Sequence, residues 1–313
     1  MYNSLSYKTK QFFWLTIKLL VVIVCLCFIY IKLTQNNELS WSDFLKNLES
    51  YKIFSLKNIL FLLLFSCLNH YFEILKWQVL VNSITKISFF EAVKQSLSSL
   101  TVSLITPNRI GEYGAKAIFF EEKKRKKIIV LNFIGNFYQM LTTLFFGFFG
   151  LLYFFKINNI TVDIYKISTY LIILVICVLA FFLLVKKNNY IKNSIYKIKN
   201  FTSILKHKLK LKILFLSFLR YLIFSHQLYF LLHLFHLEIS YLAAISAITT
   251  LYFIASIIPM LSIFDVVLKG SVAVWIFSFF NFNPILILSI TTSMWLLNFV
   301  FPAILGSYFV LII

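Results

Sequence analysis

The sequence predicts an all-α polytopic membrane protein with about six full transmembrane helices and two re-entrant helical hairpins. Three observations predict this class. Of the 313 residues, 60% are hydrophobic and 13% are charged, and the mean hydropathy is +0.87. Long apolar segments recur along the chain. Lys and Arg outnumber Asp and Glu by 30 to 11, and many lie between those segments, as in loops held in the cytoplasm. This composition excludes a soluble enzyme, a disordered protein and a disulfide scaffold, because too few polar residues remain to cover a soluble core.

Six segments are apolar and long enough to cross a bilayer, which takes about 20 residues. They cover residues 12–33, 54–80, 128–155, 167–185, 213–237 and 284–313. The first is long and lacks a small-residue cleavage site, so we expect an uncleaved span rather than a signal peptide.

The charges between the spans set their orientation. With the N-terminus in the cytoplasm, two spans bring the chain back to the cytoplasm near Lys86, and the basic cluster 123–127 belongs there as well. The less hydrophobic stretch 84–120 therefore begins and ends on one side, as a re-entrant hairpin. The third and fourth spans then place the loop 186–212, which has nine lysines and no acid, in the cytoplasm.

The second broken stretch, residues 243–282, begins and ends outside, because the short loop 236–240 before it holds no Lys or Arg. The two hairpins then enter from opposite faces and form an inverted repeat. We predict one integral membrane domain over residues 1–313, with hairpins at 84–120 and 243–282 and a basic cytoplasmic loop at 186–212. We expect a multi-pass protein of the bacterial inner (cytoplasmic) membrane with its N-terminus in the cytoplasm.

The two broken stretches share a pattern. Each has a helix of small and polar residues, then Pro107 or Pro259, a short break, an acid, and a lysine four residues after the acid. Charges at membrane depth are costly unless they are paired or face water, and interrupted helices in matching halves point to a binding site. The ordinary alternative, two simple loops, does not fit the charges of the neighbouring loops. The residues predicted to bind substrate are Pro107, Arg109, Gly111, Glu112, Lys116, Pro259, Asp265 and Lys269, with Glu73 and Arg220 as secondary candidates.

Polar residues also recur inside the spans. Glu73 and Lys76 share one stripe of the second span, and the third span carries a stripe of amides between residues 132 and 139. Amides of membrane helices ordinarily hydrogen-bond across helix interfaces, and for the third-span stripe this use is an equal alternative to a functional one. It is less favoured for Glu73 and Lys76, because they carry charge. Arg220 lies inside the fifth span, where it holds a phosphate or carboxylate or, equally, extends toward the cytoplasmic surface near Lys212.

No motif predicts a metal or a cofactor. His226, His233 and His236 lie close together, but their spacing matches no common zinc motif, and neither a Walker loop nor GxGxxG occurs. We therefore assign no metal and no cofactor. The positive charge is interpreted as a signal for topology rather than for nucleic acid. We expect the loop 186–212 to lie on anionic headgroups, with a cytoplasmic protein partner as the lesser alternative.

A signature of the form T-P-x-R-x-G-E occurs at residues 106–112. It resembles the signature of the lysylphosphatidylglycerol synthase transmembrane-region family. The second signature of that family, of the type I-P-x-x-x-G-x-x-E, is matched only at Ile258 and Pro259, since Asp265 stands where Glu is common and residues 262–264 replace glycines. The resemblance covers essentially the whole chain. It implies two re-entrant hairpins around a central cavity and, in bifunctional relatives, a flippase that moves aminoacylated phosphatidylglycerol between leaflets.

The resemblance favours a lipid flippase or transporter, in which Arg109 and Lys116 engage a lipid phosphate while Glu112 and Asp265 balance charge or bind an amine. The alternative is a membrane enzyme or accessory protein of polyprenyl-linked glycolipid metabolism, with the two acids as base or acid. A third interpretation is an assembly partner that uses the lysine loop. Enzyme activity is not favoured, because no soluble aminoacyltransferase domain follows the membrane region. The expected partners are membrane lipids with an anionic or phosphate headgroup and no nucleic acid, and oligomerisation is left open.

Overall fold

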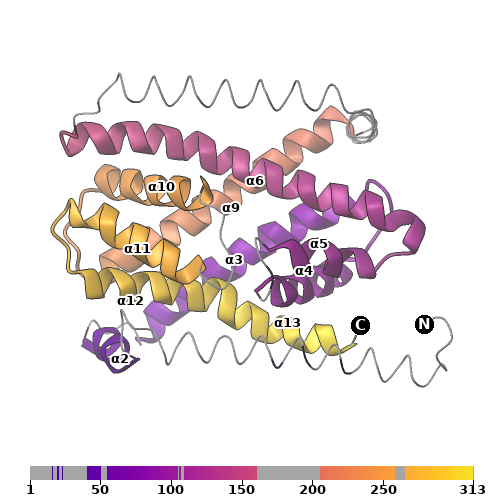
Figure 1. Ribbon diagram of the computed structural model, residues 1–313, viewed down its shortest axis with the longest axis horizontal. Helices are drawn as coiled ribbons and strands as arrows, with labels where there is room; N and C mark the ends of the chain where they lie inside the picture. The colour runs from indigo at the N-terminus through magenta and orange to yellow at the C-terminus, as the bar shows by residue number, and fades with distance from the viewer. Residues whose placement is uncertain are drawn as a thin grey trace.

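The computed structural model describes residues 16, 20, 23, 41–50, 55–104, 106, 109–160, 205–257 and 265–312. Within these ranges all regular structure is helical and no strand occurs (Figure 1). The predicted span 167–185 lies outside the described residues, and so does the span 12–33 apart from three positions.

Four long apolar helices correspond to four of the predicted spans, which makes the chain a multi-pass membrane protein. They are α3 (Leu56–Val81), α6 (Glu122–Ile157), α9 (His207–Leu234) and the run Pro284–Ile312. α6 and α9 begin six residues before the predicted starts at 128 and 213. Both early turns are rich in lysine, which favours helix. At 36 residues, α6 is about 54 Å long, so its basic first turns extend beyond a hydrocarbon core of about 30 Å.

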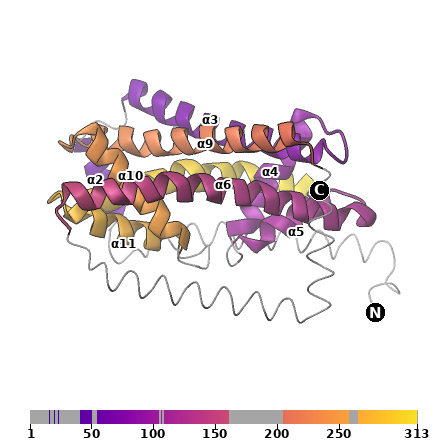
Figure 2. The ribbon, with the colours of Figure 1, turned by 90° about the horizontal axis from the view of Figure 1, so that it is seen from above.

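The two broken stretches each form a pair of shorter helices. The first contains α4 (Phe89–Leu104) and α5 (Ile110–Ile118), and the second contains α10 (Tyr241–Ile257) and α11 (Asp265–Ser278). The helices of each pair pack against each other. With 16 and 17 residues, α4 and α10 are about 25 Å long, too short to cross the hydrocarbon core. The pairs lie toward opposite ends of the long helices (Figure 1, Figure 2).

The packing of the first half corresponds to that of the second. α3, the long helix before the first pair, packs against α9, the long helix before the second pair. α4 packs against α13 (Phe301–Ile312), and α10 packs against α6. The first helix of each pair therefore lies on the long helix that follows the other pair.

Glycines allow this crosswise packing. A Cβ atom at Gly306 of α13 would overlap the carbonyl of Leu97 on α4, and one at Gly150 of α6 would overlap the side chain of Thr249 on α10. Small residues at such points let membrane helices approach closely. The two contacts lie near the middle of α4 and of α10.

The last long run contains a π-helical turn. It consists of α12 (Pro284–Trp295), the turn η3 (Leu296–Val300) and α13. The amide of Phe301 donates to the carbonyl of Leu296, one residue further back than in an α-helix, and Pro302 has no amide hydrogen to donate. The carbonyls of residues 297 and 298 therefore lose their usual intrahelical partners. Two side chains of α3 lie against them instead: Ser66 donates to the first at 2.6 Å, and a His70 ring nitrogen lies 3.1 Å from the second.

The apolar core is divided into two main clusters. One surrounds Trp77, Leu131 and Ile213 near the first helix pair. The other surrounds Leu231 and Phe277 near the second pair and includes residues of the short helix α2 (Trp41–Ser50). Buried polar and charged side chains lie on α3, α4, α5, α6, α9, α10 and the last long run.

Candidate functional site

A cavity of about 460 Å³ lies between the two helix pairs. Its wall comes from both pairs, from α3, α6 and α9, and from the π-helical turn. The charged side chains that line it among the described residues are Glu73, Arg109, Glu112, Lys116, Arg220 and Lys269. All of them belong to the predicted set of site residues, which the fold brings together from four helices and the break before α5.

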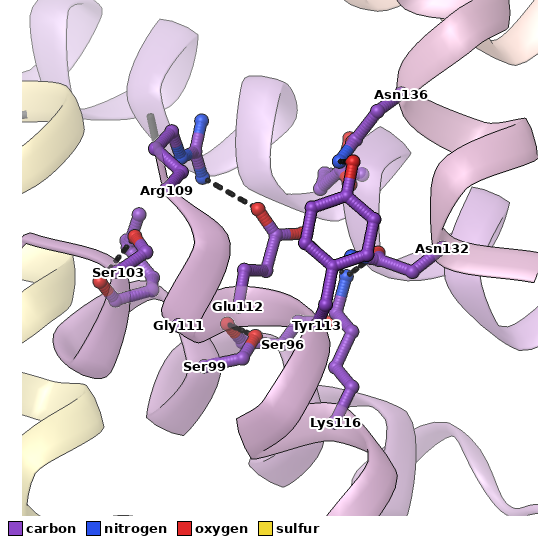
Figure 3. Close-up of polar contacts among 12 residues, drawn as sticks. Ser96, Ser99, Ser103, Arg109, Gly111, Glu112, Tyr113, Lys116, Asn132 and Asn136 are labelled. Carbon is purple, nitrogen blue, oxygen red and sulfur yellow. Dashed lines mark hydrogen bonds and ion pairs between the residues drawn. The ribbon is translucent and has the colours of Figure 1, made fainter. Parts of the chain in front are cut away.

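Glu112 is the centre of the charge cluster on α5 (Figure 3). Lys116 Nζ donates to Glu112 Oε1 at 2.7 Å, and Arg109 Nη2 lies 3.3 Å from Oε2. Lys116 also donates to Asn132 Oδ1 of α6 at 2.8 Å, and its ammonium lies 4.3 Å from the ring centre of Trp77. Glu112 and Lys116 are buried, whereas the Arg109 side chain is 40% exposed. The predicted pair Glu112–Lys116 is therefore formed, and a second cation shares its carboxylate.

The geometry of the break before α5 explains three residues of the signature at 106–112. The backbone amide of Gly111 donates to Thr106 Oγ1 at 2.9 Å, so the threonine satisfies an amide at the start of the helix. A Cβ atom at Gly111 would lie 2.7 Å from that oxygen and 2.9 Å from the carbonyl of Val102. Arg109 stands between them with φ 57°, in the left-handed region. Such a conformation is uncommon for a residue with a Cβ atom, and strained residues cluster at functional sites.

Glu73 is the centre of a second charge cluster, between α3 and α9. Its Oε2 lies 2.7 Å from Lys76 Nζ and 2.8 Å from Arg220 Nη1. Arg220 Nε also donates to Asn69 Oδ1 at 3.1 Å, and Lys76 donates to Gln139 Oε1 of α6 at 3.4 Å. Arg220 thus pairs with a carboxylate inside the helix bundle.

A chain of amides joins this cluster to the π-helical turn. Asn69 Nδ2 donates to Asn298 Oδ1 at 2.9 Å, and Asn298 Nδ2 donates to Gln227 Oε1 at 2.9 Å. All three amide side chains are buried. Sequence reasoning missed Asn298, although one signal was present: it is an amide within an apolar run, four residues before Pro302.

Lys269 and Arg109 approach the same aromatic ring. The ammonium of Lys269 lies 5.1 Å from the ring centre of Phe299, and the guanidinium carbon of Arg109 lies 6.0 Å from it. Phe299 belongs to the π-helical turn and also lines the cavity. The break before α5 and helix α11 therefore each place one cation at this ring, a convergence that the sequence did not predict.

The amide stripe of α6 makes interhelical hydrogen bonds and also faces the cavity. Asn136 Nδ2 donates to the Tyr113 hydroxyl at 3.2 Å, and Gln139 Nε2 donates to the carbonyl of Ser217 at 3.4 Å. Asn136 and Gln139 line the cavity. The ordinary interhelical use, which was an equal alternative, is thus present.

Three predicted site residues are described incompletely or not at all. Pro107 and Pro259 lie outside the described residues, and Asp265 begins α11 but its side chain also lies outside them. The histidines of α9 are separate from the cavity: His226 Nε2 lies 2.9 Å from the Tyr241 hydroxyl. In the described ranges no three His, Cys, Asp or Glu side chains gather as metal ligands.

The chemistry of the cavity suits a polar, anionic group. Its described wall contains four cations and two carboxylates, together with amides and hydroxyls that donate hydrogen bonds. Each carboxylate already accepts contacts from two cations. A carboxylate held in this way is a weak proton acceptor, so the geometry favours binding over acid–base chemistry.

Comparison with protein families gives one match. The family model described as "Lysylphosphatidylglycerol synthase TM region" matches residues 15–306. No curated protein matches the chain significantly.

Proposed function

The chain belongs to the family of lysylphosphatidylglycerol synthase TM regions, and from this premise we propose that it moves a phosphate-bearing lipid between the two leaflets of a membrane. Members of this family flip or otherwise handle lipids. The single observation that carries the proposal is the cavity of about 460 Å³, which is lined by charges and surrounded by helices long and apolar enough to span a bilayer.

The proposed membrane arrangement is an inverted repeat. The pairs α4–α5 and α10–α11 enter from opposite faces, as two re-entrant hairpins, and their inner ends meet near mid-depth. This arrangement is supported by their places toward opposite ends of the long helices (Figure 2) and by their crosswise packing on α13 and α6. We further propose six full spans and a cytoplasmic N-terminus, with residues 123–127 and the basic segment 186–212 in the cytoplasm of a bacterium.

In this mechanism the headgroup crosses the membrane inside the cavity while the acyl chains remain in lipid. Cations of the cavity replace the water around the phosphate, which would otherwise cost several kcal/mol to bury. The outer faces of α3 and α6 expose large apolar side chains, along which acyl chains can lie. The two helix pairs then open the cavity to one leaflet at a time, as expected for inverted repeats with broken helices.

The cavity residues take different parts in this mechanism. Arg109 is the most exposed of the ion-paired cations there, and it contacts the phosphate. Lys116 is buried, so it serves mainly to hold Glu112 and Asn132 in place rather than to contact the lipid directly. Glu73 and Arg220 join α3 to α9 behind the headgroup.

A transport assay tests this function. The purified full chain is reconstituted into liposomes that contain phosphatidylglycerol labelled with a fluorophore on one acyl chain, and dithionite quenches the label in the outer leaflet. We expect quenching of the inner-leaflet label to be faster with wild type than in protein-free liposomes, and much slower with Arg109→Ala. Lys126→Ala removes an exposed cation outside the cavity and serves as the control. Equal rates for wild type and Arg109→Ala would remove Arg109 from the mechanism.

The alternative is chemistry on a polyprenyl-phosphate lipid by a membrane enzyme. It requires Glu112 or another acid to exchange protons with substrate. The two cations on Glu112 do not favour this role. Sugar turnover by the purified protein would favour the enzyme over the transporter.

A further inference from the structure

The cavity has a mouth beside α6. Two of the residues that line the cavity, Met140 of α6 and Ser256 of α10, are also exposed at the protein surface. A third lining residue, Arg109 in the break before α5, has a side chain that is 40% exposed. Residues that line a cavity and are themselves exposed lie at its opening. These three residues therefore border the mouth, from α6, from the last turn of α10 and from the start of α5.

The mouth lies where α6 passes from one helix pair to the other (Figure 1). Toward the start of α6, Asn132 accepts a hydrogen bond from α5 at 2.8 Å, and Asn136 donates one to α5 at 3.2 Å. Toward its end, Gly147 and Gly150 leave no room for a Cβ atom beside side chains of α10. Met140 lies between these two contacts, which are about 16 Å apart along the helix. The mouth therefore lies between α5 and α10, and α6 forms one of its sides.

The mouth opens at the middle of the proposed membrane. The apolar stretch of α6 covers residues 128–155, and Met140 lies about 18 Å from its first residue and about 22 Å from its last. The hydrocarbon core of a bilayer is about 30 Å thick, so an opening at this depth meets acyl chains rather than water. Ile110 and Ile257, which follow two of the mouth residues in the chain, are more than half exposed. The outside of the mouth therefore suits hydrocarbon.

The inside of the mouth has the opposite chemistry. Asn136 and Gln139 of α6 line the cavity, together with the ion pair of Glu73 and Arg220. Charges at membrane depth are costly unless they are paired or meet a polar group, so a ligand in the mouth must place a polar end inside and an apolar end outside. A bilayer lipid has both ends in one molecule. Water and small phosphate compounds have no apolar part for the outer side.

We propose that this mouth is a lateral portal for a membrane lipid, whose headgroup lies in the cavity while its acyl chains leave between α5 and α10, across Met140. The inference rests on the proposed function for its transport readout. It adds to that function the place at which the headgroup and the acyl chains separate, and it makes Met140 and Ser256 contact residues for the lipid.

A matched pair of bulky substitutions on α6 tests the portal. Met140 and Leu141 are neighbours at the same depth, 44% and 39% exposed, and Met140 lines the cavity whereas Leu141 does not. We expect Met140→Trp to slow the movement of acyl-labelled phosphatidylglycerol in the dithionite assay about tenfold, because bulk in the path of the lipid raises its barrier. Leu141→Trp adds similar bulk outside the mouth and is expected to stay within about twofold of wild type. Equal rates for the two variants would overturn the portal.

A second variant narrows the mouth from the other side. Ser256→Trp adds bulk at the end of α10 and is expected to slow the same lipid. Thermal unfolding in detergent checks the fold of all three variants. A slow Met140→Trp with the Tm of wild type supports the portal. If Met140→Trp unfolds earlier than wild type, Ser256→Trp decides, and an unchanged rate for a stable Ser256→Trp contradicts the inference.

Photo-crosslinking identifies the occupant of the mouth without a transport readout. Benzoylphenylalanine replaces Met140 or Leu141 in the full chain, the protein is solubilised in detergent with phosphatidylglycerol, and the adducts are identified by mass. We expect a much higher yield of the phosphatidylglycerol adduct at position 140 than at position 141. Equal lipid yields at the two positions, or an adduct at position 140 with a segment of this chain, would rule the portal out.

The two experiments separate this inference from the proposed function. A lipid adduct at position 140 without transport by wild type would uphold the mouth as a lipid site and reject the proposed function. Transport by wild type that Met140→Trp and Ser256→Trp leave unchanged would uphold the proposed function and overturn the portal.

Discussion

Glu73 on α3 and Arg220 on α9 form an ion pair of 2.8 Å that joins the long helices preceding the two helix pairs, beside the cavity. Lys76 shares the same carboxylate oxygen at 2.7 Å. One acid thus balances two cations that come from different helices. Removal of Glu73 therefore leaves two cations without a carboxylate, whereas removal of Arg220 leaves Glu73 paired with Lys76.

Glu73→Gln is expected to destabilise the protein more than Arg220→Met. Loss of the acid leaves two largely buried cations without a carboxylate, which costs about 3 kcal/mol. Loss of Arg220 leaves Glu73 paired with Lys76, so the cost is about 1 kcal/mol. Thermal unfolding in detergent, followed by intrinsic fluorescence, gives the order of the two variants. An equal decrease in Tm for both would show that Lys76 does not hold Glu73 by itself.

The contact between His70 and the π-helical turn depends on Pro302. His70→Ala leaves the carbonyl of Asn298 without the ring that satisfies it and is expected to cost about 2 kcal/mol. In a Pro302→Ala background the restored amide at position 302 competes for that carbonyl, so the same change costs less. Thermal unfolding of wild type, the two single variants and the double variant gives the coupling free energy between positions 70 and 302.

A control for this cycle comes from a histidine on another helix, α9. His226 lies against the Tyr241 hydroxyl and the carbonyl of Leu222, and neither belongs to the π-helical turn. His226→Ala should therefore cost the same with and without Pro302→Ala. If the cost of His70→Ala is also the same with and without Pro302→Ala, Pro302 does not determine the partner of the Asn298 carbonyl.

Gly111 and Gly114 form a matched pair on one short helix. A methyl group at Gly111 would lie 2.7 Å from Thr106 Oγ1 and 2.9 Å from a backbone carbonyl, whereas one at Gly114 would have no neighbour within 4 Å. We expect Gly111→Ala to destabilise the protein by about 2 kcal/mol and to slow lipid transport. Gly114→Ala is expected to be neutral or to stabilise by up to about 1 kcal/mol. Similar effects of the two changes on Tm would show that the contact with Thr106 relaxes freely.

The sequence alone located the long helices because their apolar stretches are limited by bilayer thickness. The prediction 54–80 corresponds to Leu56–Val81, and 284–313 corresponds to Pro284–Ile312. α6 and α9 begin before the predicted spans, because a helix that leaves the membrane continues through lysines, which are good helix formers. The hydropathy of the sequence therefore does not show how far α6 and α9 continue beyond their apolar segments.

The candidate site was predictable as a set of residues but not as a set of pairs. Charges at membrane depth must be paired or hydrated, so Glu112 and Lys116 stood out from their spacing alone. The partnership of Glu73 with Arg220 joins residues 147 positions apart, and no local pattern encodes it. The same is true of Phe299. It lies in an apolar stretch of the sequence, and only the tertiary fold places it beside Arg109 and Lys269.

The left-handed backbone at Arg109 provides the sharpest test of why an arginine is kept there. Glycine adopts φ 57° without strain, whereas a residue with a Cβ atom does so at a cost of about 1 kcal/mol. Arg109→Gly and Arg109→Ala remove the same guanidinium, and only the first relieves the backbone. We therefore expect Arg109→Gly to be more stable than Arg109→Ala by about 1 kcal/mol in thermal unfolding. Both variants should transport phosphatidylglycerol much more slowly than wild type.

If Arg109→Gly retained the wild-type rate, the arginine would serve the structure of the break and not the lipid. If Arg109→Gly were no more stable than Arg109→Ala, the left-handed conformation at this position would not be strained. A more stable but inactive glycine variant would show that the strained arginine is retained for its side chain.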